Sequence, residues 1–158
     1  MVLLGKFKFI RSLIRFLDYR FSRFSRFQNY LERYKPDLIF ATDIQNEHDV
    51  QLIQTAIAFG AKSIGMVRSW DNLTSFQGVM RMIPDELLVG TEIMREEAIR
   101  YHDVPMERIV VVGKPHYDNY LKKTRMSREE FFRTFGLNPA KKIIFFNTWG
   151  DTYAGKSG

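Results

Sequence analysis

Four short apolar runs, each bounded by polar or turn residues, constrain the fold of this chain more than any other feature. They occupy residues 37–42, 62–67, 86–90 and 108–112. Apolar runs of this length are typical of strands buried on both faces of a parallel sheet. Helical patterns at residues 47–59 and 92–101 alternate with them, which predicts right-handed βαβ units. We therefore expect an α/β fold, a Rossmann-like parallel sheet with flanking helices.

The N-terminal segment, residues 1–35, carries the charge asymmetry of the chain. It holds nine Lys or Arg and two acidic residues, a balance of +7, whereas the remaining residues hold fifteen basic and sixteen acidic ones, a balance of −1. Apolar residues recur every three or four positions from Lys6 to Tyr34, which predicts one basic amphipathic helix, or two broken near Ser22 or Ser25. Such a segment either covers one face of the sheet, with arginine stems over apolar surface, or contacts an anionic membrane.

Composition argues against several classes of site. The chain has no cysteine and only three histidines, so disulfides, thiolate nucleophiles and a structural metal site are not expected. We interpret His102 and His116 as surface or hinge residues. No apolar run approaches the roughly 20 residues of a membrane-spanning helix, and the start lacks the features of a signal peptide, so a cytoplasmic location is expected. Because the basic excess sits on one segment, nucleic acid is not an expected partner.

The pattern changes after about residue 120. Ser127 and Glu130 form a capping box that opens a short helix, and Gly136 ends it. A fifth apolar run at residues 142–147 predicts another strand. We therefore divide the chain into a basic amphipathic helical segment at 1–35, a Rossmann-like portion at 36–120, an interdomain connector at 121–138 and the start of a truncated second domain at 139–158.

Parallel sheets bind ligands at the carboxyl ends of their strands. In this chain the rule selects Thr42 and Asp43, then residues 68–75, 90–92 and 113–118. Thr91 fits a helix N-cap, and helix N-termini attract anions. Gly113 permits a tight turn or a close ligand approach, and Pro115 gives the next segment a rigid start. Both residues also fit a plain turn from strand to helix.

Trp70, Asp71 and Asn72 form the most distinctive of these places. An indole offers a flat apolar surface to a sugar ring, and the neighbouring Asp and Asn side chains can bind hydroxyl groups. A carboxylate or an imidazole at a strand end can deprotonate a hydroxyl group of a bound substrate, so Asp71 is the first candidate base, followed by Asp43 and His48. The alternative is an Asx-turn built by Asp71 or Asn72, with Trp70 packed inward.

Residues 150–157, GDTYAGKS, match the phosphate-binding pattern G-x-x-x-x-G-K-[ST] after an apolar run. The bulky Tyr153 at an interior position, and the absence of a following helix or an Asp-bearing strand for magnesium, argue against a nucleoside triphosphatase. A Gly-rich turn after a strand can also bring the main chain close to a phosphate group without such an activity. In either interpretation, phosphate is the expected neighbour of Gly150.

Two longer stretches together resemble a known family. PDELLVGTE at residues 84–92 and PMERIVVVGKPHYD at residues 105–118 resemble the end of the N-terminal domain in GT-B glycosyltransferases and in the similarly folded sugar-nucleotide 2-epimerases. SWDNLTS at residues 69–75 looks like a loop in a subgroup of bacterial surface-polysaccharide transferases. The resemblance covers about residues 35–151, and it rests on the combined spacing of these motifs.

The resemblance implies a GT-B two-domain architecture and a fragment of a glycosyltransferase. Such an enzyme moves a sugar from a nucleotide-sugar donor to a surface-glycan or lipid-linked acceptor, with the nucleotide sugar as substrate and no cofactor. Most of the donor-binding C-terminal domain is expected to be missing, so the isolated chain is expected to be inactive. The implied substrate-binding residues are Trp70, Asn72, Thr74, Thr91, Glu92, Gly113 and Pro115, and the implied donor-phosphate residues are Thr148 and Gly150.

Two alternatives stay open beside the transferase. One is a sugar-nucleotide 2-epimerase on the same fold. The other is a non-catalytic, flavodoxin-like interaction domain whose basic helix faces a membrane. For both the transferase and the interaction domain, an anionic membrane surface is an expected partner, which would place the protein at the inner face of the membrane.

Overall fold

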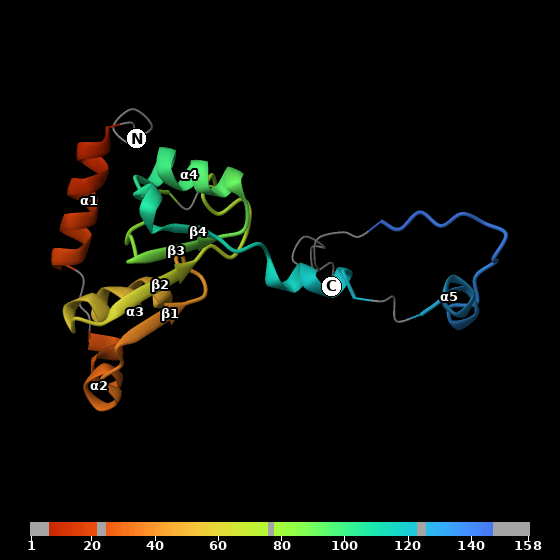
Figure 1. The fold of residues 1–158 in the computed structure, drawn as a ribbon, viewed down its shortest axis with the longest axis horizontal. Helices are drawn as coiled ribbons and strands as arrows, with labels where there is room; N and C mark the ends of the chain where they lie inside the picture. The colour runs from red at the N-terminus through yellow and green to blue at the C-terminus, as the bar shows by residue number, and fades with distance from the viewer. Residues whose placement is uncertain (1–6, 22–24, 76–77, 123–125, 147–158) are drawn as a thin grey trace, which may run out of the picture. The chain divides into compact units, whose positions relative to one another are not determined.

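Four short strands form one parallel sheet in the order β1-β2-β3-β4 (Figure 1). Phe40 lies opposite Ile64, Met66 opposite Leu88, and every neighbouring pair runs parallel. The predicted α/β fold with a parallel sheet is therefore confirmed, and each strand falls within its predicted range. The strands are β1 (Leu38–Ala41), β2 (Lys62–Met66), β3 (Glu86–Val89) and β4 (Ile109–Val111).

The computed structural model describes residues 7–21, 25–75, 78–122 and 126–146. The chain divides into two compact units, residues 1–115 and 116–158. Besides the sheet, the first unit contains α1 (Lys8–Phe21), α2 (Ser25–Tyr34), α3 (Glu47–Ala58), α4 (Glu92–His102) and the 3-10 turn η2 (Met106–Arg108). The second contains α5 (Arg128–Thr134), and the 3-10 segment η3 (Pro115–Tyr120) begins at the boundary. The four-part division expected from the sequence stays a prediction.

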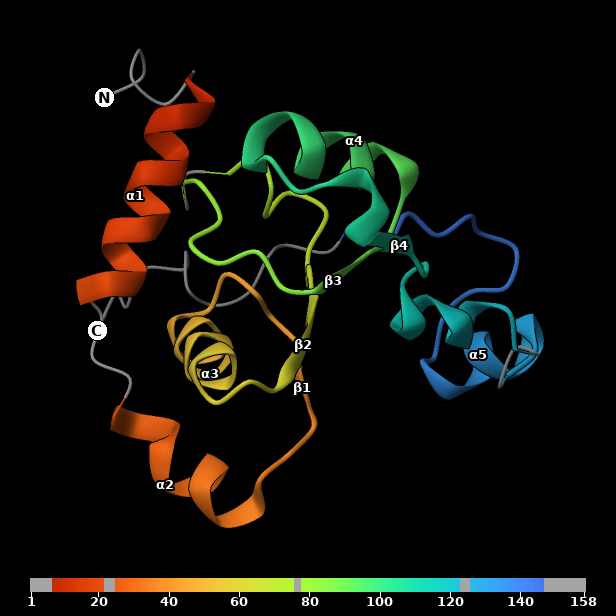
Figure 2. The same cartoon turned by 60° about the vertical axis from the view of Figure 1, so that its left-hand side comes forward.

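Among the described residues, the helices next to the sheet cover one face of it. Crossovers between parallel strands are right-handed, so strands in consecutive order place their connections on the same face. Figure 2 shows α3 and α4 together on that face, where Leu87, Val89 and Ile109 are at most 5% exposed. On the opposite face Phe40 and Val110 are 50% and 43% exposed. The expectation that these strands are buried on both faces is therefore wrong.

The helix ends follow the local chemistry of their residues. Asn46 caps α3, because its side-chain oxygen accepts a hydrogen bond from the main-chain N–H of His48 at 2.9 Å. Gly60 follows that helix with a φ of +77°, a left-handed conformation that favours glycine. Thr91 caps α4, accepting a hydrogen bond from the N–H of Met94 at 3.2 Å. The predicted N-cap at Thr91 is confirmed, and the helix that the sequence predicts at residues 47–59 ends directly before Gly60.

The basic N-terminal segment forms two helices, as one of the two alternatives predicted. α2 packs Leu31, which is 3% exposed, against Ala56 of α3 and against Ala61. α1 has no buried residue, and charged side chains make the polar contacts that hold it. No helix in the described parts of the chain is long and apolar enough to cross a membrane.

For the second unit, the predicted capping box is confirmed and the predicted fifth strand is not found in the described residues. α5 opens with the capping box: Ser127 Oγ accepts from the N–H of Glu130 at 3.1 Å, and Glu130 Oε2 accepts from the N–H of Ser127 at 2.9 Å. Residues 142–146, in contrast, form no strand in the described chain, and Ile144 is 94% exposed. An apolar run needs a neighbouring strand to satisfy its main-chain hydrogen bonds. The predicted fifth strand is therefore wrong over these residues.

Candidate functional site

The carboxyl ends of the strands carry a cluster of opposite charges. Asp43 follows β1, Arg68 and Asp71 follow β2, and Lys114 follows β4. Because the carboxyl ends of parallel strands meet at one edge of a sheet, residues distant in sequence come close there. We call these four residues the charged edge.

Asp43 and Arg68 form the first half of the charged edge. The main-chain N–H of Asp43 donates to Asp49 Oδ2 of α3 at 2.7 Å, which fixes the chain where it leaves the sheet. Asp43 Oδ2 lies 3.6 Å from Nη1 of Arg68. The Arg68 side chain is 77% exposed, so this pair adds little to stability and leaves most of the guanidinium open to a ligand.

Lys114 ties the ends of three strands together. Its Nζ donates to the main-chain oxygen of Arg68 at 3.2 Å. Its stem crosses Gly90, at the end of β3, so closely that a Cβ there would lie 2.8 Å from Lys114 Cε. Gly113 has a φ of +76°, which gives the turn before Lys114 a conformation that favours glycine. Burial lowers the pKa of Lys114, and the negative charge of Asp71 opposes that shift, so Asp71 acts on the same ammonium.

Trp70 stands outside this cluster, with 69% of its surface exposed. It does not pack inward, as the Asx-turn alternative required. The turn after it is closed through the main-chain oxygen of Asp71, which accepts from the N–H groups of Thr74 at 3.1 Å and Ser75 at 2.8 Å. The main-chain oxygen of Asn72 accepts from Gln45 Nε2 at 2.7 Å, which anchors the turn to the segment after β1.

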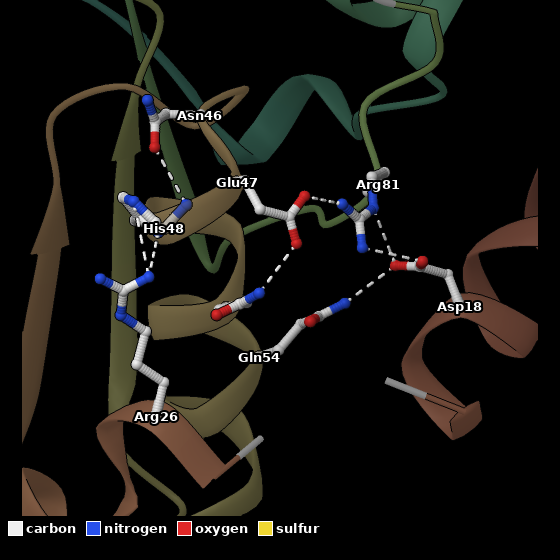
Figure 3. Close-up of polar contacts among 8 residues, drawn as sticks. Asp18, Arg26, Asn46, Glu47, His48, Gln54 and Arg81 are labelled. Atoms are coloured by element: carbon white, nitrogen blue, oxygen red, sulfur yellow. Dashed lines mark hydrogen bonds and ion pairs between the residues drawn. The ribbon is translucent and has the colours of Figure 1, made fainter. Parts of the chain in front are cut away.

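Several predicted site residues have other partners. The Thr91 hydroxyl caps α4, and Glu92 forms an ion pair with Arg95 at 2.7 Å. Figure 3 shows His48 beside Arg26 of α2, whose Nη1 lies 2.7 Å from His48 Nδ1. This contact turns the imidazole of His48 toward α2, and no hydrogen bond within the described residues joins that ring to the charged edge.

The remaining predicted residues divide into two groups. Thr74 Oγ1 lies 3.4 Å from the main-chain oxygen of Asp71, and Pro115 is an exposed first residue of η3. Thr148, Gly150 and the whole 150–157 motif lie outside the described residues, as does the side chain of His116. In the described parts of the chain, no group of three His, Cys, Asp or Glu side chains could hold a metal ion.

His102 is a structural residue of the core, which corrects its interpretation as a surface or hinge residue. It is 2% exposed at the end of α4. Its Nδ1 accepts from the N–H of Met80 at 2.9 Å, and its Nε2–H donates to the main-chain oxygen of Leu73 at 2.7 Å. Burial lowers its pKa, although the hydrogen bond to Leu73 opposes that shift. Neutral His102 therefore fastens the loop that presents Trp70.

Sequence reasoning missed His102, Arg68 and Lys114, although each left a signal. Met94, Ala98 and His102 are spaced by four residues, so a helix places them on one buried face. Arg68 and Lys114 belong to two of the strand-end stretches already selected, but no role was assigned to either.

Comparisons with protein-family models, with curated proteins and with solved structures each found no match.

Proposed function

We propose that the charged edge holds the acceptor in a glycosyl transfer reaction, within a GT-B type of enzyme. The observation that carries this proposal is the placement of two cations, Arg68 and Lys114, beside two carboxylates. The exposed indole of Trp70 belongs to the same loop, two residues after Arg68. Cations of this kind bind phosphate or carboxylate groups, and an aromatic face suits a sugar ring. The resemblance of residues 84–118 to sugar-nucleotide enzymes supplies the reaction type.

In the proposed reaction, an acceptor hydroxyl oxygen attacks the anomeric carbon of the donor sugar. The bond from that carbon to the donor phosphate oxygen breaks, and the nucleotide leaves with the bonding electrons. A carboxylate of the charged edge takes the hydroxyl proton. Asp71 suits this role better than Asp43, because Asp43 is only 20% exposed and already faces Arg68. Arg68 and Lys114 would hold a negatively charged group of the acceptor.

Ligand binding by the 158-residue chain tests the proposal. The chain has two tryptophans, so Trp149→Phe leaves Trp70 as the only indole reporter. We expect a saturable change in its fluorescence with glucose 1-phosphate, and a weaker one with glucose or inorganic phosphate alone. Arg68→Gln should weaken binding about tenfold, the effect of losing roughly 1.4 kcal/mol.

Lys62→Gln is the matched control for Arg68→Gln. Lys62 begins β2, at the opposite edge of the sheet, and its side chain is 77% exposed, like that of Arg68. This variant should bind glucose 1-phosphate as the parent does. Equal losses in the two variants, or no saturable response in the parent, would remove the charged edge as a binding site.

In a preparation of the protein that transfers sugar, a second experiment tests which carboxylate acts as the general base. Asp71→Asn keeps the size of the side chain and removes its proton-accepting charge. Because general-base catalysis supplies about 10²- to 10⁴-fold in rate, turnover should fall by that factor. Near-normal turnover in Asp71→Asn, with a loss in Asp43→Asn, would move the role to Asp43.

A further inference from the structure

α1 turns its apolar side away from the body of the first unit. The large apolar side chains on that side are 42% to 77% exposed, and α1 lies along the outside of the unit in Figure 2. Contiguous exposed apolar surface of this kind marks an interaction site in soluble proteins. We call these residues the outward face of α1: Phe9, Leu13, Ile14, Phe16, Leu17 and Phe21.

The opposite, charged side of α1 holds the helix in place. Arg11 Nε donates to Asp103 Oδ2 at 2.7 Å, and Arg15 Nη1 reaches the same carboxylate at 3.2 Å. Arg15 Nε also donates to the main-chain oxygen of Met80 at 2.8 Å. The side chains of Arg11 and Arg15 are only 11% and 14% exposed. These ionic contacts, together with the partly buried Tyr19 that packs against the core, fix which side of the helix faces out.

The charges left exposed on α1 are positive. Its only acid, Asp18, pairs with Arg81 at 2.9 Å and accepts from Gln54 of α3 at 2.9 Å (Figure 3). Lys8 and Arg20, in contrast, are exposed. An apolar, Phe-rich face accompanied by basic residues fits a negatively charged lipid surface.

The size of the outward face favours a lipid surface over a second copy of the chain. α1 has 14 residues, so it is about 21 Å long, and it presents six large apolar side chains on its outward face. A stable protein interface takes roughly 20–30 residues from each partner. An interfacial helix needs no such number, because the lipid surface is continuous and the helix only sinks its apolar side into the headgroup region.

We propose that α1 lies in the surface of an anionic membrane, with its outward face among the lipid acyl chains. Arg11, Arg15 and Asp18 remain on the protein side and keep the helix attached to α3 and to the end of α4. Lys8 and Arg20 contact the lipid headgroups. Membrane contact through α1 is independent of sugar transfer at the charged edge.

Co-sedimentation of the 158-residue chain with vesicles tests this proposal. We expect binding to vesicles of phosphatidylglycerol mixed with phosphatidylcholine, and much weaker binding to phosphatidylcholine alone or at high salt. The double variant Phe9→Gln/Phe16→Gln should lower binding to the anionic vesicles by more than about tenfold, because two aromatic side chains no longer enter the lipid. Arg20→Gln should lower it about fivefold.

Tyr30→Gln/Tyr34→Gln is the matched control. These tyrosines are 62% and 66% exposed on α2, close to the 61% of Phe16, and they lie outside the outward face of α1. The control should bind anionic vesicles as the parent does. Circular dichroism should show the parent helix content in both double variants, since the replaced side chains are exposed.

Three results would overturn the proposal. The first is equal binding of the parent to anionic and neutral vesicles. The second is unchanged vesicle binding by Phe9→Gln/Phe16→Gln. The third is a dimer of the parent in sedimentation equilibrium that the same double variant abolishes, because the outward face would then belong to a second copy of the chain.

Discussion

α1 and α2 come from one basic, aromatic-rich segment, yet they attach to the first unit in opposite ways. α2 places apolar Leu31 inward, at 3% exposure, against Ala56 of α3. α1 has no fully buried residue; it places Arg11 and Arg15 inward, against Asp103, and packs only the partly buried Tyr19 against the core. Apolar spacing therefore identifies an amphipathic helix, but it does not decide which side faces the protein. In α1 the carboxylate of Asp103, distant in the sequence, determines which side of the helix faces the protein.

The largest effect that separates the two helices should come from truncating one leucine in each. Leu31→Ala removes a buried side chain of α2 and should lower the free energy of unfolding by about 3 kcal/mol. Leu17→Ala makes the same change in α1, where the side chain is 42% exposed, and should cost less than about 0.5 kcal/mol. Urea unfolding measures both. Similar losses in the two variants would mean that α1 also packs through its apolar side.

A somewhat smaller effect should follow from removing the anchor of α1. Asp103→Asn leaves the guanidinium groups of Arg11 and Arg15 without their carboxylate, and all three side chains are less than 15% exposed. We expect a loss of about 2 kcal/mol, concentrated on α1, because a buried charge without its partner is destabilising. Hydrogen exchange should accelerate over residues 8–21 and stay unchanged over residues 25–34. Unchanged exchange in α1 would contradict its attachment through Asp103.

As the pH falls, the stability that His102 contributes should be lost before the stability that Asp103 contributes to α1. Burial lowers the pKa of His102 below the 6.5 of an unfolded chain, so the unfolded state takes up its proton first as the pH falls. Stability should therefore begin to drop below about pH 6.5. The Arg11 hydrogen bond holds the pKa of Asp103 below its ordinary 3.8, so the stability from that pair is present above pH 3.8 and is lost only at lower pH.

The free energy of unfolding, measured with urea over a range of pH, distinguishes these two losses of stability. The loss that begins near pH 6.5 should disappear in His102→Gln, whose amide can both accept from Met80 and donate to Leu73. It should persist in His48→Gln, which changes an exposed histidine. If the loss near pH 6.5 persists in His102→Gln, another group is responsible for it.

The smallest expected difference is in salt sensitivity. High salt screens the ion pairs of α1, which keep some contact with water, and it does not weaken apolar contacts of the kind that α2 makes. Amide exchange in α1 should therefore become faster with added sodium chloride relative to exchange in α2. Parallel changes in the two helices would show that they share one kind of attachment.

Much of the fold could be predicted because its signals are local. The apolar runs located all four strands, and Thr91 and Ser127 marked the starts of two helices through short-range hydrogen bonds. Two features depend on distant partners and were not predicted. The uncovered face of the sheet follows from the direction in which the strands are added. Within the described part of the chain, no neighbouring strand pairs with residues 142–146.

Only those residues of the candidate site that closely follow an apolar run could be predicted from the sequence. The sequence places Asp43 and Trp70 at strand ends because each follows an apolar run. It could not show that Lys114 crosses Gly90 to reach Arg68, since this contact joins three strands. Nor could it show that His48 turns toward Arg26, because that depends on where α2 packs.

The opposite attachment of α1 and α2 can be measured directly, because the chain has no cysteine of its own. Single cysteines can be introduced by Phe9→Cys and Phe16→Cys on α1, and by Tyr30→Cys and Leu31→Cys on α2. Their rates of reaction with a thiol reagent then report exposure without lipid present. We predict that positions 9 and 16 react as fast as position 30, and that position 31 reacts far more slowly. Slow reaction at positions 9 and 16, similar to that at 31, would contradict an apolar side of α1 that faces outward.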